Sequence, residues 1–552
     1  MPTMSASTDS SATDVDASAV AEAPKIEALF LIRFDKKVGY TIAWKRSTTD
    51  IPLENAVEFK SLPSGLHAVQ SDLVYFTHEG YAGLSAFAKG DAGAEDRNAN
   101  FVAVGILVNK EGRFGRLGRA WLLAGRLEKM AAALADDSDT VTPLEEFWAE
   151  QTPTLQSRLT GETSQHGEAK GHSRARAIST ASAVLPVDES LPDYHPALSI
   201  LQYIDVFGPL VFRLQQAALL RKRILFVGSP PVRAACEFVY NLSVFSSISP
   251  RDAELLIPGT EELLRLPTLF SIGVHDIPFL EDLRSPKHGG HTPGAEPLEG
   301  WAACTTDEII STKTQLYDII VELPPTYDAP AQARRWPRIR TSDGCLIKAS
   351  QRDLARYKLL HKELFNLRNR PQLAPDAYTD DENEEAAPLL SREEVDTKRA
   401  ADDFNEAYDD AVVEPMTWSR LAYLGFMWWA SAGERDAYTT AERDTDRELI
   451  GDLTEYSQSV ETAIIAYFHR QSSLLIQTIS RLMESDREEE NDDDVDGDTL
   501  IIDRDDLSRM GLDTWSEADR AFVQEFGSLY FARTIGVKGS EVDCCGLRVP
   551  VF

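Results

Sequence analysis

The first 150 residues show the alternation of apolar and polar positions that is typical of β-strands. The stretch IEALFLIRFDKKVGYTIAWK predicts two strands joined by a turn at residues 36–39, and SDLVYFTHEGYAGLSAFAKG predicts two more around residues 78–80. The nearly all-apolar run Phe101–Asn109 predicts a fifth strand in the middle of a sheet. An apolar stripe from Leu117 to Leu134 predicts a long amphipathic helix. Together these patterns predict a compact α/β unit at residues 25–150.

After this unit the pattern changes to alternating strands and helices. Residues 1–24 and 151–190 are polar and aperiodic, so we expect a disordered tail and a linker. The central part, residues 191–345, opens with one long helical stretch, HPALSILQYIDVFGPLVFRLQQAALLRK. The apolar strand Ile224–Val227 and a second helix follow, and then the runs LFSIGVHDIPFL, GWAACTTDEIIS and YDIIVELPP. This alternation predicts a mixed or parallel sheet covered by helices.

The remainder, residues 346–552, is predicted to be helical. The expected helices are Gln351–Asn366, Phe404–Ala432, Ser457–Glu484 and Ser516–Arg533. Two acidic runs interrupt this region: residues 376–410, with 14 acidic and 3 basic residues, and residues 486–506, with 12 acidic and 2 basic residues. We expect both to be solvated insertions. The predicted fold class is therefore α/β, with a five-stranded sheet and its helices beside a central α/β unit and a helical C-terminal region.

Charge and cysteine content narrow the choice of partners and compartment. The chain carries 56 basic and 89 acidic side chains, a formal net charge of −33, which argues against binding to DNA, RNA or anionic lipid by charge attraction. The odd number of cysteines, without metal-ligand spacing, predicts free thiols in a reducing compartment: Cys236, Cys304, Cys345, Cys544 and Cys545. No secretory signal pattern is evident, and the most apolar helix, Leu421–Gly433, is too short to span a bilayer. We therefore expect a cytoplasmic protein.

The stretch RILFVGSPPVRAACEFVY has the layout of a phosphate-binding loop, with a strand, a glycine turn and a helix. Such a loop needs free backbone N–H groups, and usually a lysine at the start of the helix. Here Pro230 and Pro231 stand where those donors are needed, and the only nearby base is Arg233. The sequence therefore favours a simple strand–helix junction over a nucleotide site.

No set of residues typical of covalent catalysis is evident. The most enzyme-like pair is His275–Asp276, because an aspartate can orient an imidazole. Adjacent residues on a strand point to opposite faces, so being neighbours does not allow the two side chains to hydrogen-bond. A structural or interface role is favoured. An enzyme that uses the pair stays as an alternative, and it would need a deep apolar pocket and a third polar group.

Two further features point to ligands less strongly. The stretch DDDVDGDTLIID resembles a calcium-binding loop, with Gly497 at position six and acids at positions one, three, five and twelve: Asp492, Asp494, Asp496 and Asp503. The short Asp503 at position twelve and Thr499 at position eight depart from that loop, so no metal site is predicted. The pair Cys544–Cys545 could be palmitoylated, although the apolar residues around it favour a packed terminal segment.

Four stretches are long or unusual enough to compare with known families: VEFKSLPSGLHAVQSDLVYF, ILFVGSPPV, GVHDIPFLEDL and GWAACTTDEIISTKTQLYDIIVELP. Together they resemble the DENN module, and particularly its LCHN branch, over roughly residues 26–330. The resemblance implies a longin-like N-terminal lobe, a central α/β lobe and a helical third lobe. It also implies a guanine nucleotide exchange factor for a Rab GTPase in membrane traffic, with no cofactor.

An exchange factor breaks no covalent bond. It binds the nucleotide-free GTPase more tightly than the GDP-bound form, so the lack of a catalytic triad or a Walker lysine is expected. We expect the GTPase to contact loops where the central strands end: Ser229, Pro230, His275, Asp276, Thr305, Thr306 and Asp307. Thr305–Asp307 could equally form a helix N-cap. Charge reversal at Asp276 is expected to slow GDP release without unfolding the protein.

The alternative function is that of a longin- and DENN-based trafficking adaptor, which binds a GTPase without exchanging its nucleotide. Its binding would not depend on the nucleotide state of the GTPase. In both cases no transmembrane segment is expected, and recruitment to endomembranes would come through the prenylated partner.

Overall fold

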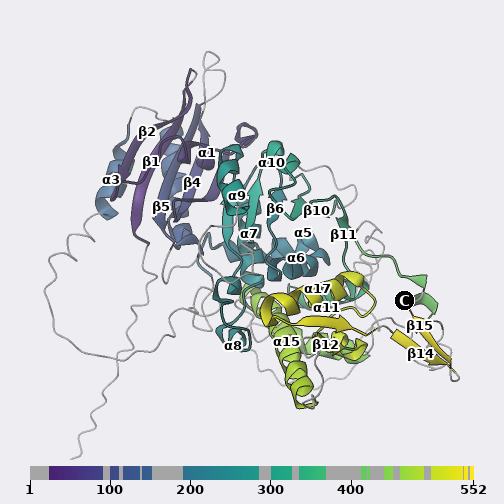
Figure 1. Cartoon of the computed structure of the whole chain (residues 1–552). Helices are drawn as coiled ribbons and strands as arrows, with labels where there is room; N and C mark the ends of the chain where they lie inside the picture. Colours follow the sequence, from purple (N-terminus) through teal and green to yellow (C-terminus); the bar gives the residue numbers. More distant parts are fainter. Residues whose placement is uncertain are drawn as a thin grey trace, which may run out of the picture.

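The computed structural model shows one large sheet with helices on both faces and a mainly helical region beside it (Figure 1). The residues that it describes are 24–35, 37–90, 100–110, 116–136, 140–151, 191–284, 300–325, 335–368, 412–418, 420–422, 425, 440–451, 460–489, 499–538, 540–544 and 547–551.

The N-terminal sheet section consists of five antiparallel strands. They are β1 (Ile26–Asp35), β2 (Gly39–Ser47), β3 (Ser71–His78), β4 (Tyr81–Gly90) and β5 (Asn100–Asn109), in the order β3-β4-β5-β1-β2. The five predicted strands are confirmed. β5 lies between two strands and is buried from Val102 to Val108, which explains its continuous apolar sequence. The helices of this section are α1 (Val57–Ser61), η1 (Leu66–Ala68), η4 (Ala120–Leu123), α2 (Ala124–Asp136) and α3 (Thr142–Gln151).

The central sheet section continues the same sheet with six more strands. They are β6 (Ile224–Val227), β7 (Thr268–Ser271), β8 (Ala302–Thr305), β9 (Ile319–Glu322), β10 (Arg338–Thr341) and β11 (Leu346–Ile347), in the order β11-β10-β9-β6-β8-β7. The first four strands are parallel, and β10 and β11 form an antiparallel edge. The prediction of a mixed or parallel sheet is confirmed.

Helices cover both faces of the central section. They are η7 (Pro196–Ser199), α5 (Ile200–Phe207), α6 (Leu210–Leu219), α7 (Arg233–Phe245), α8 (Pro250–Ala253), η8 (Glu261–Leu264), η9 (Val274–Asp276), α9 (Ile277–Arg284) and α10 (Glu308–Thr312). Phe226 and Cys304 point into a core shared with α5, α6 and α7, whereas Leu225 and Ala303 point into a second core with α9 and α10. Successive strand residues point to opposite faces, so each short strand serves both cores.

A single residue pair joins the two sections into an 11-stranded sheet. Phe76 of β3 pairs with Phe270 of β7 in antiparallel orientation. Phe270 is buried and has a φ of +58°, in the left-handed region, which costs a residue with a side chain roughly 1 kcal/mol. The register between β7 and β8 shifts at the same residue. The backbone strain at Phe270 therefore lies where β7 pairs with both β3 and β8.

Two expectations for the central part are wrong. The predicted single helix at residues 195–222 is two helices, α5 and α6. The chain direction bends by 118° between them. Gly208 has a φ of +53° and Pro209 lacks an N–H group, so the helix ends there and restarts. His275 and Asp276 lie not on a strand but in the 3-10 helix η9, which starts after Gly273.

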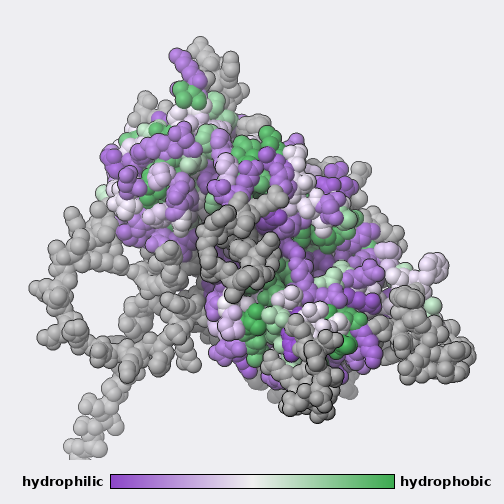
Figure 2. All heavy atoms as spheres, in the orientation of Figure 1, coloured by the Kyte–Doolittle hydropathy of each residue, from purple (hydrophilic) through white to green (hydrophobic). Residues whose placement is uncertain are grey.

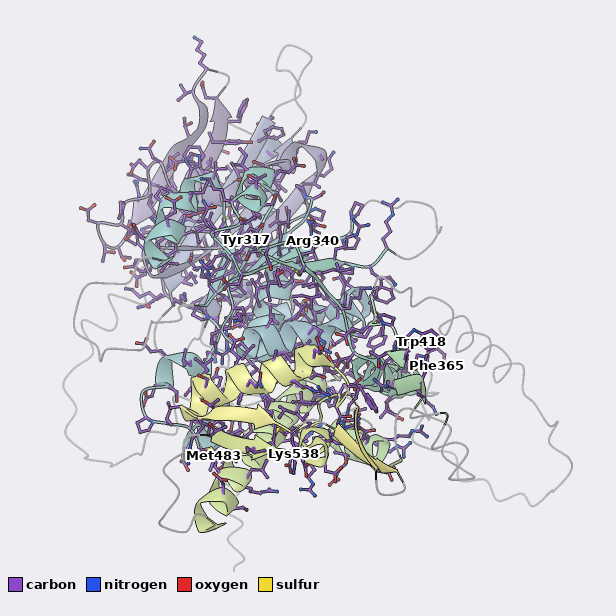
Figure 3. All side chains as sticks on the ribbon, turned by 45° about the vertical axis from the view of Figure 1, so that its right-hand side comes forward. Tyr317, Arg340, Phe365, Trp418, Met483 and Lys538 are labelled. Carbon is purple, nitrogen blue, oxygen red and sulfur yellow. The ribbon has the colours of Figure 1, made fainter. Side chains whose placement is uncertain are left out.

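Among its described residues, the C-terminal region contains five helices and two small sheets. The helices are α11 (Gln351–Arg368), α14 (Thr440–Ile450), α15 (Val460–Glu489), α16 (Arg504–Arg509) and α17 (Glu517–Phe531). The strands are β12 (Thr499–Ile502), parallel to β13 (Thr534–Val537), and β14 (Ser540–Cys544), antiparallel to β15 (Leu547–Val551). Figure 3 shows Tyr317 and Arg340 in the central section and Met483 and Lys538 in this C-terminal region.

Three of the four predicted C-terminal helices are confirmed as α11, α15 and α17, but the strands correct the expectation of a purely helical region. In the predicted helix Phe404–Ala432, residues 412–417 are not helical, because Val413 forms a β-bridge with Ala349, whereas the described residues 418, 420–422 and 425 are helical. The acidic run at 376–410 lies outside the described residues. The run at 486–506 is not wholly a solvated insertion, since its described part includes β12 and the end of α15.

One hydrophobic core extends through all three parts of the chain. It includes strands of the N-terminal section, helices α5 to α7, and Tyr357 and Phe468 from α11 and α15. The rings of Phe468 and Phe245 stack with their centroids 4.3 Å apart. Among the described helices, no single one is long and apolar enough to cross a bilayer. The bent pair Pro196–Phe207 and α6 meets the criteria jointly, and most of its apolar residues are buried in this core.

Candidate functional site

The glycine–proline loop after β6 directs the start of α7 toward the N-terminal section. The carboxylate of Asp72, in β3, accepts the backbone N–H groups of Val232 at 2.5 Å and Arg233 at 3.2 Å. It also accepts its neighbour's N–H, from Leu73, at 2.8 Å. A helix N-terminus attracts an anion because its first N–H groups have no partner within the helix. Here a carboxylate of the same chain occupies the place that a phosphate takes in a phosphate-binding loop.

Asp72 is a buried acid in this position. Burial raises its pKa from 3.8 to about 6, against the lowering effect of the three N–H donors and of Arg233. The donors at the helix terminus favour the charged form, but the loss of solvation outweighs them. Asp72 therefore titrates closer to neutral pH than an ordinary aspartate.

The pair His275–Asp276 contacts α1 through both of its side chains. Asp276 is buried, forms an ion pair with Lys60 at 2.8 Å, and accepts the N–H of Gly273 at 2.9 Å. Lys60 also donates to the carbonyl of Thr77 at 2.8 Å. The imidazole of His275 stacks on the ring of Phe59, with the centroids 3.7 Å apart. His275 and Asp276 thus each contact a residue of α1. Among the contacts of the described residues, no hydrogen bond joins His275 to Asp276.

Asp307 also reaches the N-terminal section. It occupies the N-cap position of α10, as the alternative interpretation expected, but its side chain does not cap that helix. Its carboxylate instead accepts the N–H of Val274 at 3.1 Å and the hydroxyl of Ser64. Thr305 is buried and donates to the carbonyl of Ile272 at 2.8 Å. The Oγ1 atom of Thr306 is buried without a hydrogen-bond partner in the described part of the chain.

Pro230 completes these contacts. It is buried against Gly65, where an added Cβ would lie 3.2 Å from its Cγ atom, and Gly65 itself has a φ of +90°. Ser229, next to it, is exposed. We define the joint as residues 57–72 together with Thr305, the last residue of β8, and the loops that follow β6, β7 and β8.

All seven residues predicted from the sequence lie in the joint. Pro230, Asp276 and Thr305 are buried, whereas Ser229 and His275 are exposed. Sequence reasoning missed Lys60 and Asp72 as the groups that meet them. Both lie within VEFKSLPSGLHAVQSDLVYF. The sequence signal for them was therefore the resemblance of this stretch to the DENN module, because no local pattern marks either residue.

An apolar surface lies beside the joint. Figure 1 shows α1, α9 and α10 close together, and Figure 2 shows an apolar patch at the position of α10. Its largest exposed side chains are Ile309 of α10, 60% exposed, and Phe279 of α9, 49% exposed. Exposed apolar patches of this kind often mark a protein–protein binding surface.

The calcium-loop resemblance is tested only in part. Asp492, Asp494 and Asp496 lie outside the described residues. Asp503 is the N-cap of α16 and accepts the N–H of Asp506 at 2.9 Å, so its carboxylate has a structural role. Within the described ranges no group of three or more His, Cys, Asp or Glu side chains is placed to hold a metal ion. Cys544 ends β14, and Cys545 is not among the described residues.

Comparison with known proteins identifies the family. The family model described as DENN domain-containing protein 11 matches residues 29–333, which run from β1 to β9 and leave out β10 and β11 of the central section. The proteins of that name from Danio rerio and Xenopus laevis are each 30% identical to this chain, over 311 and 307 residues. The chain belongs to the DENN domain-containing protein 11 family, which confirms the resemblance to the DENN module.

The alignments with these two relatives cover about half of each chain, whereas an alignment with a fungal relative covers nearly all of both chains. Each alignment covers 54% of this chain, and the chain spans 54% and 59% of the two relatives. Uncharacterized protein ANR2 of Saccharomyces cerevisiae is 24% identical over 565 residues, which cover 95% of both chains. A second family model, described as a domain of unknown function (DUF4484), matches residues 413–550.

Proposed function

We propose that this chain is a DENN-type guanine nucleotide exchange factor that promotes GDP release from a Rab GTPase in membrane traffic. The observation that carries this proposal is the family match over residues 29–333, which includes the strands β1 to β9 of the two sheet sections and the joint between them. In this proposal the N-terminal sheet section is the longin-like lobe and the central section is the DENN lobe. The residues act by binding a partner, so the proposal needs no cofactor.

The contacts in the joint suggest two different roles for the predicted residues, one structural and one in binding. Buried groups such as Asp276 and Pro230 hold the two sections in a fixed relative position. Exposed groups beside them, Ser229 and His275 together with Phe279 and Ile309, form the proposed GTPase-contact surface. A rigid surface favours one conformation of a partner, and GDP is released if the nucleotide-free form fits best.

The proposed cellular setting follows from the same partner. A Rab GTPase carries its own prenyl group, so the exchange factor can be a cytoplasmic protein that reaches endomembranes peripherally. The net charge of −33 also makes direct attraction to anionic lipid an unsuitable basis for recruitment.

The test is a fluorescent-GDP release assay across a panel of purified Rab proteins. We expect the wild-type chain to accelerate release from at least one Rab. Ile309→Asp and Phe279→Asp should each slow that release by about fivefold or more, because truncating or charging an interface anchor costs over about 1 kcal/mol.

The matched control is Ile501→Asp, on β12, where a similarly exposed isoleucine (68%) lies away from the joint. It should leave release unchanged, and all three variants should keep the wild-type melting midpoint. Binding without acceleration for every Rab, regardless of nucleotide, would instead identify the adaptor. Equal activity of the Ile309 and Ile501 variants would exclude the proposed surface.

A further inference from the structure

Two buried cysteines face each other in the core of the central section. The Sγ atoms of Cys236, in α7, and Cys304, in β8, are 3.5 Å apart, and both residues are fully buried. The thiol of Cys236 also lies 3.6 Å from the carbonyl oxygen of Tyr75, in β3. The pair therefore lies where α7, β8 and the N-terminal section meet, and the proposed exchange activity makes no use of it.

We propose that Cys236 and Cys304 form a disulfide when the protein meets hydrogen peroxide, and that this bond locks α7 to β8. A disulfide bond is about 2.05 Å long, so the two sulfur atoms need to approach by about 1.5 Å. The side chains already point at each other, so rotation of the two χ1 angles and a small shift of α7 are enough.

The reaction balances with peroxide as the only oxidant. The thiolate of one cysteine attacks the O–O bond, forms a sulfenic acid and releases the first water after protonation. The thiolate of the second cysteine displaces the sulfenic oxygen, which leaves as the second water. Two S–H bonds and one O–O bond are broken, one S–S bond and two O–H bonds are formed, and the two electrons that the sulfur atoms lose reduce the peroxide to two waters.

Burial sets the conditions under which this happens. It raises the pKa of the Cys236 thiol, an effect that the neighbouring Cys304 reinforces, so the reactive thiolate is scarce in the closed structure. A small oxidant is required, and we expect slow formation that follows transient opening of α7 from the sheet. The exposed thiol of Cys345 gives an internal reference for an unhindered cysteine.

A disulfide between Cys236 and Cys304 would affect the joint, because both residues lie next to groups that form it. Cys236 lies in the first turn of α7, whose N-terminus binds Asp72, and Cys304 directly precedes Thr305. A disulfide here would fix the two central elements that contact the N-terminal section. It would also close a loop of the unfolded chain, which stabilises the folded state.

The experiment treats the full-length protein with hydrogen peroxide, blocks the remaining thiols with an alkylating agent under denaturing conditions, and maps unreduced peptides by mass spectrometry. We expect one main cross-link, between the peptides that contain Cys236 and Cys304, and a melting midpoint a few degrees higher. Dithiothreitol should reverse both changes. Cys236→Ser and Cys304→Ser should each abolish the cross-link and the shift, while Cys345→Ser should keep both.

The peptide map of the wild-type protein decides the proposal even if a serine variant folds poorly. Oxidation of Cys345 while Cys236 and Cys304 stay fully alkylatable would overturn it. So would conversion of either buried thiol to a sulfinic or sulfonic acid without cross-linking, or a cross-link that leaves the melting midpoint of the wild-type protein unchanged.

Discussion

Asp72 shows how one side chain can determine the role of a motif. The loop between β6 and α7 resembles a phosphate-binding loop in outline, and the structure fills its anion position with the carboxylate of Asp72. Because this carboxylate comes from β3, it also connects the N-terminal section to the central section. The cost is the burial of a charge, which is why its pKa is raised to about 6.

Asp72 should make stability depend on pH. Its pKa is higher in the folded state than the ordinary value of 3.8, so its favourable contribution is complete below pH 3.8 and is lost as the pH rises through about 6. The difference amounts to roughly 3 kcal/mol over this window. Asp72→Asn should remove this component. The measurement is urea unfolding at pH 4.5 and pH 7, with Asp193→Asn, at an exposed position, as the control. An unchanged pH slope in the Asp72 variant would contradict the assignment.

The ion pair between Lys60 and Asp276 should be important for stability. Charge reversal, Asp276→Lys, places two ammonium groups together and leaves the N–H of Gly273 without its acceptor. We now expect a loss of about 2–3 kcal/mol, in contrast to the sequence-based expectation of an intact fold. The swapped double variant, Lys60→Asp with Asp276→Lys, should recover part of this loss in urea unfolding. Reversal of the exposed pair, by Glu54→Lys opposite Lys45, should change the midpoint little.

At the scale of elements, buried charges attach the C-terminal helices to the central section. Arg213 of α6 forms ion pairs with Asp519 of α17 at 2.7 Å and with Asp353 of α11 at 2.9 Å. All three side chains are buried, and burial raises the pKa of Asp353 even though Arg213 opposes this. A buried pair adds little net stability compared with apolar packing, but removal of one partner leaves a charge without compensation.

Arg213→Met should therefore destabilise the protein by about 3–5 kcal/mol, because Asp519 and Asp353 stay buried without their cation. The matched control is Lys222→Met. Lys222, just after the end of α6, also contacts α17, through Glu525, but the two side chains are 28% and 45% exposed, and solvent-exposed pairs contribute less than about 1 kcal/mol. Urea unfolding of the two variants measures the difference. Equal losses would show that burial of the Arg213 cluster has no special cost.

At the scale of the whole molecule, the three parts share one hydrophobic core. Side chains of α11 and α15 pack into the same cluster as the strands of both sheet sections. The boundaries proposed from the sequence, at residues 150, 190 and 345, therefore do not separate independent cores. Removing the C-terminal region would expose the apolar faces of α6 and α7.

A fragment that ends at residue 345 should fail to give a stable monomer. We expect aggregation in size-exclusion chromatography and the loss of a cooperative thermal transition, because Tyr357 and Phe468 no longer cover the core. A fragment that ends at residue 538 lacks β14 and β15, which form a separate two-stranded sheet in the described part of the chain, and it should unfold cooperatively. A monomeric, cooperatively melting fragment 1–345 would contradict the shared core.

The sequence determined the local elements of this protein. Period-two alternation predicted β1 to β4, the continuous apolar run predicted β5, and helical patterns predicted α7, α15 and α17, because these patterns depend mainly on which residues lie on one face. It also placed the candidate residues at the ends of β6, β7 and β8, since the ends of parallel strands meet at one edge of a sheet. Gly208 and Pro209 are a sequence signal for the break between α5 and α6. The continuous apolar pattern on both sides of them nevertheless led to the prediction of one helix.

Only the tertiary structure decided what those residues meet. Asp72 and Val232 are 160 residues apart in sequence, and Ser64 and Asp307 are 243 apart, so no local pattern reports their contacts. The same holds for the single pair Phe76–Phe270 that joins the two sections. Side-chain periodicity fixes which face of an element is buried, whereas the partner across a core depends on how distant segments pack, and that is determined by the fold as a whole.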